Sequence, residues 1–161
     1  MRKLSILIAG AALALAVIVT GAFAATTVTK VTFLAKYSGT AVTKQTDNIV
    51  DISANGSGTA TLLGAGKVTG LGKGDSSVRP CVPFSGPGSM KGPGGVITFT
   101  VKPGSAGCGD DSGQLFSITG KALVVKATGK LAKAKGVLKM TGTYDRSSGA
   151  FAVKFSGTLT K

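Results

Sequence analysis

The chain has 161 residues, with 19 lysines and arginines against six acidic residues, all aspartate, and it contains no histidine. Without histidine, neither a Ser-His-Asp triad, a Cys-His pair nor a histidine metal cluster is possible, and the usual proton shuttle at neutral pH is missing. The formal charge of +13 indicates either attraction to an anionic partner or simple solubility.

Residues 1–24 have the pattern of a Sec-type signal peptide. Arg2 and Lys3 are positively charged, residues 4–19 are apolar, and residues 22–24 form an Ala-x-Ala cleavage site. The apolar run is nearly long enough to span a bilayer, so an uncleaved anchor is the alternative. We expect cleavage, with residues 25–161 forming one domain without a further transmembrane segment, secreted or held in the periplasm or cell envelope.

The first half of this domain is rich in Thr, Val and Gly, a composition typical of strands and turns. Residues 38–47 are predicted to be a polar connection, and Asn55–Gly58 is a strong turn signal. Four strands are expected around these segments, at residues 28–37, 48–53, 59–63 and 67–71.

The middle of the chain is expected to be mostly loop. Residues 75–95 contain four of the five prolines and are predicted to form a long ordered loop, with a possible short strand near 82–84. Residues 96–102 alternate as a strand, and residues 103–113 are predicted to form another loop.

Each of these two loops contains one of the two cysteines, Cys81 and Cys108. An even count in an exported chain indicates a disulfide, worth roughly 3–4 kcal/mol in the chain-entropy model. A zinc site is the alternative, but it would need aspartate ligands, and no metal is predicted.

The last third alternates with a period of two, which predicts strands at residues 115–127, 137–144 and 151–160. The faces that carry Phe116, Tyr144 and Phe155 are expected to be buried. Asp145–Gly149 has the composition of a hairpin loop. About eight strands are therefore expected, in a small antiparallel barrel or sandwich.

The segment between the first two of these strands resembles a stretch in the dirigent and allene oxide cyclase family. That family has Thr-Gly-basic-Phe-x-x-Ala-x-Gly between two late barrel strands, and this chain has Leu131 in place of the phenylalanine. The matching residues are Thr128, Gly129, Lys130, Ala134 and Gly136. The resemblance covers roughly the last third of the chain and implies a barrel rather than a sandwich, filled by side chains or holding one small ligand.

The resemblance also implies a route to chemistry, because such barrels shape a reactive intermediate in an apolar mouth without a cofactor. Tyr37, Asp51, Tyr144 and Asp145 would supply the polar groups, and a desolvated aspartate could act as an acid. The family's plant members have an aromatic followed by Met-His-Asp near the N-terminus, where this chain has residues 31–34, Val-Thr-Phe-Leu. The alternative is that these are ordinary strand tyrosines and turn aspartates.

Two charged clusters are candidates for binding. Asp110 and Asp111 could bind Ca²⁺, but they lack the spacing of an EF-hand, so a solvated turn is favoured. The densest positive cluster is a candidate anion-binding patch, or else a solvated turn, and consists of Lys126, Lys130, Lys133 and Lys135. Arginine is scarce and no nucleic-acid-binding module is evident, so no specific nucleic-acid partner is predicted.

The sequence thus predicts an exported, disulfide-bonded, all-β barrel that is a non-enzymatic binding or envelope-associated module. Its partner would be an anionic envelope surface or polymer. One alternative is a cofactor-free cyclase or dirigent-like protein that handles a small apolar ligand in the barrel. Another is a structural matrix component that self-associates. The sequence favours a non-enzymatic role over an enzymatic one and predicts no particular oligomeric state.

Overall fold

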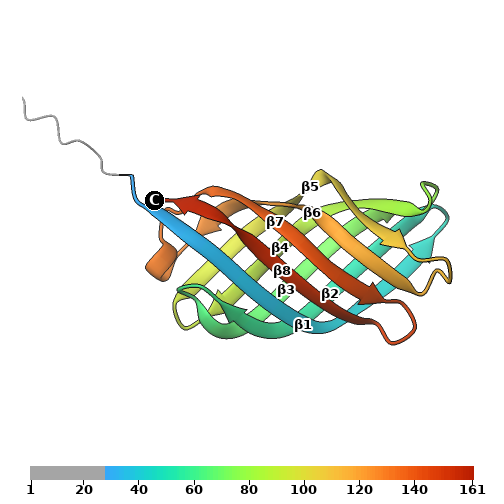
Figure 1. Cartoon of the computed structure of the whole chain (residues 1–161), viewed down its shortest axis with the longest axis horizontal. Coiled ribbons are helices and arrows are strands. Elements are labelled where there is room, and N and C mark those ends of the chain that lie inside the picture. Colours follow the sequence, from blue (N-terminus) through green and yellow to red (C-terminus); the bar gives the residue numbers. More distant parts are fainter. Residues whose placement is uncertain (1–27) are drawn as a thin grey trace, which may run out of the picture.

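A computed structural model describes residues 28–161, which form a closed barrel of eight antiparallel strands (Figure 1). The predicted all-β barrel is confirmed, while the expected signal peptide at residues 1–24 lies outside the described residues. Each strand pairs with its neighbours in sequence, and β1 closes the barrel against β8. The elements are β1 (Lys30–Thr46), β2 (Ile49–Ala60), β3 (Gly64–Asp75), β4 (Cys81–Gly92), β5 (Gly95–Gly109), β6 (Leu115–Ala127), the 3₁₀ helix η1 (Gly129–Leu131), β7 (Gly136–Asp145) and β8 (Ala150–Thr160). Among the described residues, no helix is long and apolar enough to cross a membrane.

The up-and-down topology gives the barrel two different ends. The turns β1–β2, β3–β4, β5–β6 and β7–β8 lie at one end, which we call the hairpin end. The connections β2–β3, β4–β5 and β6–β7 lie at the other end, together with the start of β1 and the C-terminus (Figure 1). We call this the terminal end.

The interior is built by the inward-facing half of each alternating strand. Phe33, Phe99 and Phe155 are almost completely buried, and the rings of Phe99 and Phe155 pack with centroids 5.3 Å apart. Burial of each phenylalanine contributes about 1.5–3 kcal/mol. The remaining core residues with little or no exposure include Leu63, Met90, Ile97, Leu138 and Leu159. Side chains therefore fill the middle and the terminal end of the barrel.

Glycines on the neighbouring strands make room for these rings. A Cβ atom built on Gly56 would lie 2.9 Å from the ring of Phe151, and one on Gly88 would overlap the ring of Phe99. Both glycines are located within strands, β2 and β4. The glycine-rich composition thus fits rings packed over bare backbone rather than turns alone.

Two segments that were predicted to be irregular are strands. The predicted connection 38–47 is mostly the second half of β1, and the predicted turn Asn55–Gly58 lies inside β2, where all four residues pair with β3. The predictions were wrong because local composition favours a turn there, whereas barrel closure satisfies the backbone on both sides. The outward positions need no apolar residue, and the inward Gly56 and Gly58 leave room for the rings of Phe151 and Tyr37.

The prediction of loops at residues 75–95 and 103–113 is also wrong for most of their length. β4 occupies residues 81–92 and β5 continues to Gly109. Pro87 follows a register shift at Gly86, whereas Pro83 is opposite Ala106 on β5 but lies beyond the last β3–β4 pair on its other side. Pro103 lies in a second register shift, between Val101 and Ala106. Prolines at bulges break no continuous ladder of hydrogen bonds.

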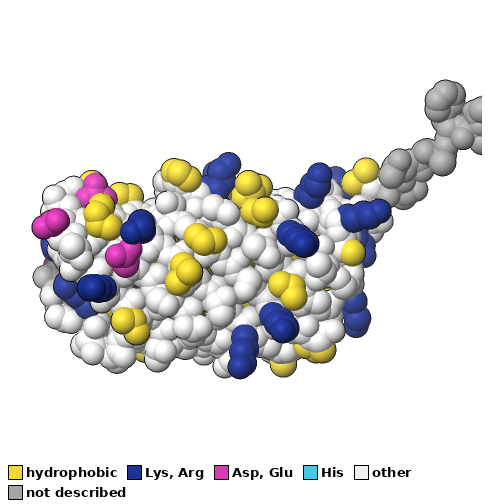
Figure 2. All heavy atoms as spheres, turned by 180° about the vertical axis from the view of Figure 1, so that it is seen from behind, with side chains coloured by type: hydrophobic (Ala, Val, Ile, Leu, Met, Phe, Trp, Pro, Cys, Tyr) yellow, Lys and Arg dark blue, Asp and Glu magenta, His cyan; other side chains and the backbone are white. Residues whose placement is uncertain are grey.

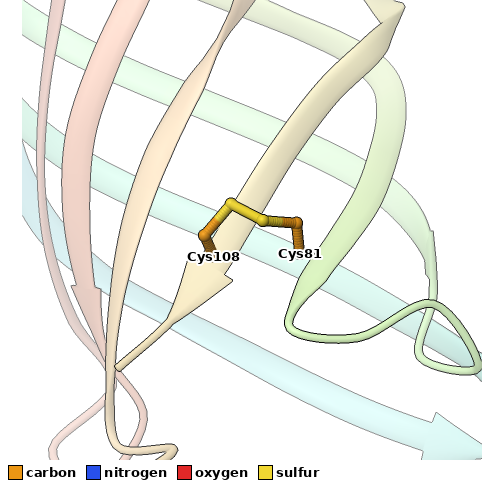
Figure 3. Close-up of a disulfide and its surroundings, with 2 residues drawn as sticks. All are labelled: Cys81 and Cys108. Atoms are coloured by element: carbon orange, nitrogen blue, oxygen red, sulfur yellow. A yellow bond between two sulfur atoms is a disulfide. The ribbon is translucent and has the colours of Figure 1, made fainter. Parts of the chain in front are cut away.

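The predicted disulfide between Cys81 and Cys108 is present, and the described residues contain no free cysteine. Its setting differs from the prediction, because the two cysteines occupy directly opposite positions on β4 and β5 rather than two loops (Figure 3). The bond lies on the hairpin-end side of the register shift. It therefore fastens together the parts of β4 and β5 that continue beyond the irregular pairing.

Candidate functional site: a lysine-rich barrel end

The connection between β6 and β7 folds across the terminal end of the barrel. Leu131 is fully buried and Ala134 is 2% exposed, so both insert into the core. Gly129 has a φ of +65°, and its backbone packs against Gly94 in the β4–β5 turn so closely that a Cβ atom would overlap the Gly94 carbonyl. The Lys130 amide donates a hydrogen bond to that carbonyl at 2.8 Å. The connection at residues 128–135 therefore covers this end of the barrel.

The same geometry turns three lysines outward. Lys130, Lys133 and Lys135 are exposed while their neighbours Leu131 and Ala134 are buried. A segment that inserts its apolar side chains into the barrel leaves its long cationic side chains to solvent. The predicted cluster is thus displayed at the end of the molecule, with Lys126 exposed at the end of β6.

Two further lysines join this cluster from distant parts of the sequence. Lys161 donates from Nζ to the Lys130 carbonyl at 3.1 Å. Lys30 is opposite Thr160, and Lys135 forms an isolated bridge with that same residue. Sequence reasoning missed both lysines because only the closure of β1 on β8 brings them to this end. We call the six residues together the terminal lysine patch: Lys30, Lys126, Lys130, Lys133, Lys135 and Lys161.

All six aspartates of the chain lie at the opposite end, in the hairpin turns or the strand residues beside them. They are Asp47, Asp51, Asp75, Asp110, Asp111 and Asp145. In Figure 2 the aspartates visible on this face lie at one end of the barrel, accompanied there by some basic residues, while the visible wall and the other end carry only basic charges. The acidic side chains are therefore confined to one end of the barrel, whereas basic residues occur along its whole length.

Three of these aspartates build turns through a shared Asp-x-Ser pattern. Asp75, Asp110 and Asp145 each accept a hydrogen bond from the serine two positions later, Ser77, Ser112 and Ser147 in turn. These serine hydrogen bonds are the main reason that the pKa of each carboxyl is lowered below its usual range. These carboxylates are thus engaged with their own turns, as Asx-turn chemistry predicts.

The Ca²⁺ hypothesis gains no support from this geometry. The Asp110 carboxylate accepts hydrogen bonds from the backbone N–H of Gln114 at 3.1 Å and from the Ser112 hydroxyl at 2.8 Å. Within residues 28–161, no group of three or more aspartates or cysteines is placed to hold a metal ion.

The candidate catalytic residues are not gathered in one cavity. Tyr37 is 3% exposed inside the barrel, and its hydroxyl has no hydrogen-bond partner; burial raises the pKa of this phenol. Asp51 lies on the outer surface of β2, where its carboxylate accepts a hydrogen bond from Lys73 Nζ at 2.7 Å.

The other two candidates lie at the hairpin end. Tyr144 is half-buried, its hydroxyl lies 3.4 Å from that of Thr43, and its ring is 6.1 Å from that of Phe116. Asp145 holds its own turn through Ser147. The structure thus places two tyrosines toward the interior and two aspartates outside it.

Comparisons with protein-family models, with characterised proteins and with solved structures find no match to this chain. The functional argument therefore depends on the charges and surfaces of the chain itself.

Proposed function

We propose that this protein is an exported, non-enzymatic binding module that attaches through the terminal lysine patch to an anionic surface or polymer of the cell envelope. The observation that carries the proposal is the confinement of the acidic side chains to the end of the barrel opposite the patch. All six aspartates lie at the hairpin end, so the attraction of the patch for an anion is unopposed by any neighbouring carboxylate side chain.

The architecture supports an attachment role rather than a cavity-based one. Phe33, Phe99, Phe151 and Phe155 are each at most 9% exposed inside the barrel. The space that a dirigent-like protein would need for a small apolar ligand is occupied there by rings. The disulfide between Cys81 and Cys108 is compatible with a location outside the cytoplasm, where such bonds persist.

The test uses the mature chain and sedimentation with liposomes of anionic or neutral phospholipid, and with a purified anionic wall polymer that contains no phosphate. We expect retention on the anionic targets that weakens as salt screens the charges. The triple variant Lys130→Ser, Lys133→Ser, Lys135→Ser should lose most of it. These three side chains are exposed, so the variant should fold.

A matched control removes the same charge elsewhere, with Lys44→Ser, Lys73→Ser and Lys102→Ser. These lysines are exposed and lie outside the terminal end. Retention of the control together with loss by the patch variant supports the proposal. Equal loss by both variants, or retention that salt does not affect, contradicts it.

A further inference from the structure

The outer wall of the barrel carries lysines in an arrangement that costs stability. The strand registers place three pairs of lysines directly opposite one another: Lys36 with Lys154, Lys67 with Lys91, and Lys121 with Lys139. Like charges at directly opposite positions of an antiparallel pair are destabilising. All six side chains are exposed, and within residues 28–161 the one salt bridge, between Asp51 and Lys73, involves none of them.

These pairs are joined into one path around the barrel. Lys154 is opposite Thr141, two residues from Lys139, so Lys139 and Lys154 are diagonal neighbours on β7 and β8. On the other side, Lys67 is opposite Ser57, and Ser57 is opposite Ser38, two residues from Lys36. We call this path the wall track; it comprises Lys121, Lys139, Lys154, Lys36, Lys67 and Lys91.

The central part of the wall track is hollowed. A shallow depression of about 500 Å³ is bordered by Lys36 and Lys154, and a second of about 360 Å³ extends to Lys67. The two share Ser38 and Ser57 on β1 and β2. Together they extend over β7, β8, β1, β2 and β3, of which β1 and β8 cross the barrel side by side (Figure 1). Five strands span roughly 20 Å at the usual strand spacing.

The lining of these depressions offers hydrogen-bond donors to an anion among largely apolar surface. It contains hydroxyl groups and bare glycine backbone beside Tyr37, Val68 and Val153, and no carboxylate. The hydroxyl-bearing residues are Ser38, Thr40, Ser57, Thr69, Thr141 and Thr143. The ammonium groups supply charge without the fixed planar fork of arginine, which favours phosphate held as a point charge over bidentate carboxylate recognition. Hydroxyl groups beside them can donate hydrogen bonds to phosphate oxygens.

We propose that the wall track is a second binding site, which takes an extended polymer of phosphate groups along the outside of the barrel. Two adjoining shallow depressions bordered by lysines fit a thin flexible chain, and the repeated lysines match its repeated charge. The polymer neutralises the opposed lysine pairs, which are a source of repulsion without it. Lys36 and Lys154, in the centre of the track, lie in the middle of β1 and β8 and outside the terminal lysine patch, so a test on these two residues separates this proposal from the first.

The experiment measures binding of the mature chain to two fluorescently labelled probes, inorganic polyphosphate and poly(glycerol phosphate), by anisotropy at about 0.15 M salt, near the physiological ionic strength. We expect the double variant Lys36→Ser, Lys154→Ser to bind the probes at least tenfold more weakly. The matched control Lys44→Ser, Lys102→Ser should change the Kd by less than twofold. Stronger binding of one probe identifies the source of the phosphate chain, and dependence on Lys36 and Lys154 is required for either.

A variant that leaves the charge unchanged separates a built site from general attraction. Ser38→Ala with Ser57→Ala should weaken binding a few-fold, because it removes hydroxyl donors in the shared part of the two depressions. The proposal is overturned if the lysine double variant and its control lose affinity equally, or if both probes bind with wild-type affinity after Lys36 and Lys154 are replaced. Liposome sedimentation of the same double variant should stay unchanged, which distinguishes this site from the terminal lysine patch.

Discussion

The two ends of this barrel are built from the same kind of connection but have opposite properties. At the terminal end, the β6–β7 connection inserts Leu131 and Ala134 into the barrel and faces its lysines outward. At the hairpin end, short turns stand around half-buried Phe116 and Tyr144 and contain the aspartates. One end is covered and basic, and the other is more open and contains every carboxylate side chain of the chain.

The difference shows how the order of residues along an up-and-down barrel determines which charged residues lie at each end. In an up-and-down barrel, successive connections alternate between the two ends. Asp47, Asp75, Asp110 and Asp145 lie at every second connection, so topology collects them at one end. The lysine-rich β6–β7 connection lies between the β5–β6 and β7–β8 turns in the sequence, so it is placed at the other end of the barrel. Spacing along the chain determines which charges become neighbours.

The hairpin end depends on the disulfide, and its removal should give the largest effect. Replacing Cys81 and Cys108 together by serine should lower the free energy of unfolding by about 3–4 kcal/mol, because the bond closes a long loop in the unfolded chain. Urea unfolding measures the loss. Hydrogen exchange should then accelerate most in the hairpin-end halves of β4 and β5, and uniform acceleration around the barrel would contradict this account.

The covered terminal end depends on Leu131. Leu131→Ala should lower the free energy of unfolding by about 3 kcal/mol, because it removes a fully buried side chain and leaves a cavity under the connection. The matched control is Leu115→Ala at the hairpin end, where the side chain is 47% exposed. That change should cost about 0.5 kcal/mol or less. Similar losses for the two variants would show that the connection does not seal the barrel.

Tyr37 lies between the two ends. Replacing it should raise the free energy of unfolding, whereas the substitutions above lower it. Its buried hydroxyl has no partner, so Tyr37→Phe should raise the free energy of unfolding by about 1 kcal/mol at neutral pH. Burial raises the pKa of Tyr37 above its usual 10.0, so the folded state keeps the proton that the unfolded chain loses above about pH 10. The wild type should therefore lose more stability than the phenylalanine variant as the pH rises past that value. If the free energy of unfolding falls with pH equally in both proteins, the Tyr37 hydroxyl is not buried as described.

The smallest expected effect concerns the Asp-x-Ser turns of the hairpin end. Because the serine hydrogen bonds lower the pKa of Asp75, Asp110 and Asp145, their stabilisation is present above the usual aspartate range and is lost as the pH falls through the lowered values. Replacing Ser77, Ser112 and Ser147 by alanine should return these pKa values toward normal. Carboxyl chemical shifts followed by NMR titration measure the change, and unchanged titration curves would show that the serines do not hold the carboxylates.

The reach of sequence reasoning differs among the strands. β6, β7 and β8 were predicted to within about one or two residues, and the expected inward placement of Phe116, Tyr144 and Phe155 is confirmed, because alternation is unbroken there. β4 and the second halves of β1 and β5 were missed. Their inward positions include glycines and their ladders contain prolines, so the local signal is that of a turn although barrel closure makes them strands.

The candidate sites divide in the same way. The lysines of the β6–β7 connection were recognisable because they are close in sequence, whereas Lys30 and Lys161 join them only through the pairing of β1 with β8. Lys36 and Lys154 lie on the first and last strands of the barrel, far apart in the sequence. They face each other only because of the register between β1 and β8. A charge pattern formed across several strands cannot be recognised from neighbouring residues in the sequence.

The sequence by itself determined that the chain is rich in strands, that histidine chemistry is absent, that Cys81 and Cys108 are available to pair, and that positive charge predominates, since each depends on composition or a period of two. The tertiary structure alone decided that aromatic rings fill the barrel over glycines, that aspartates and the terminal lysine patch lie at opposite ends, and that lysines oppose one another along the wall track. These features depend on barrel closure and register, which bring together residues that are far apart along the chain.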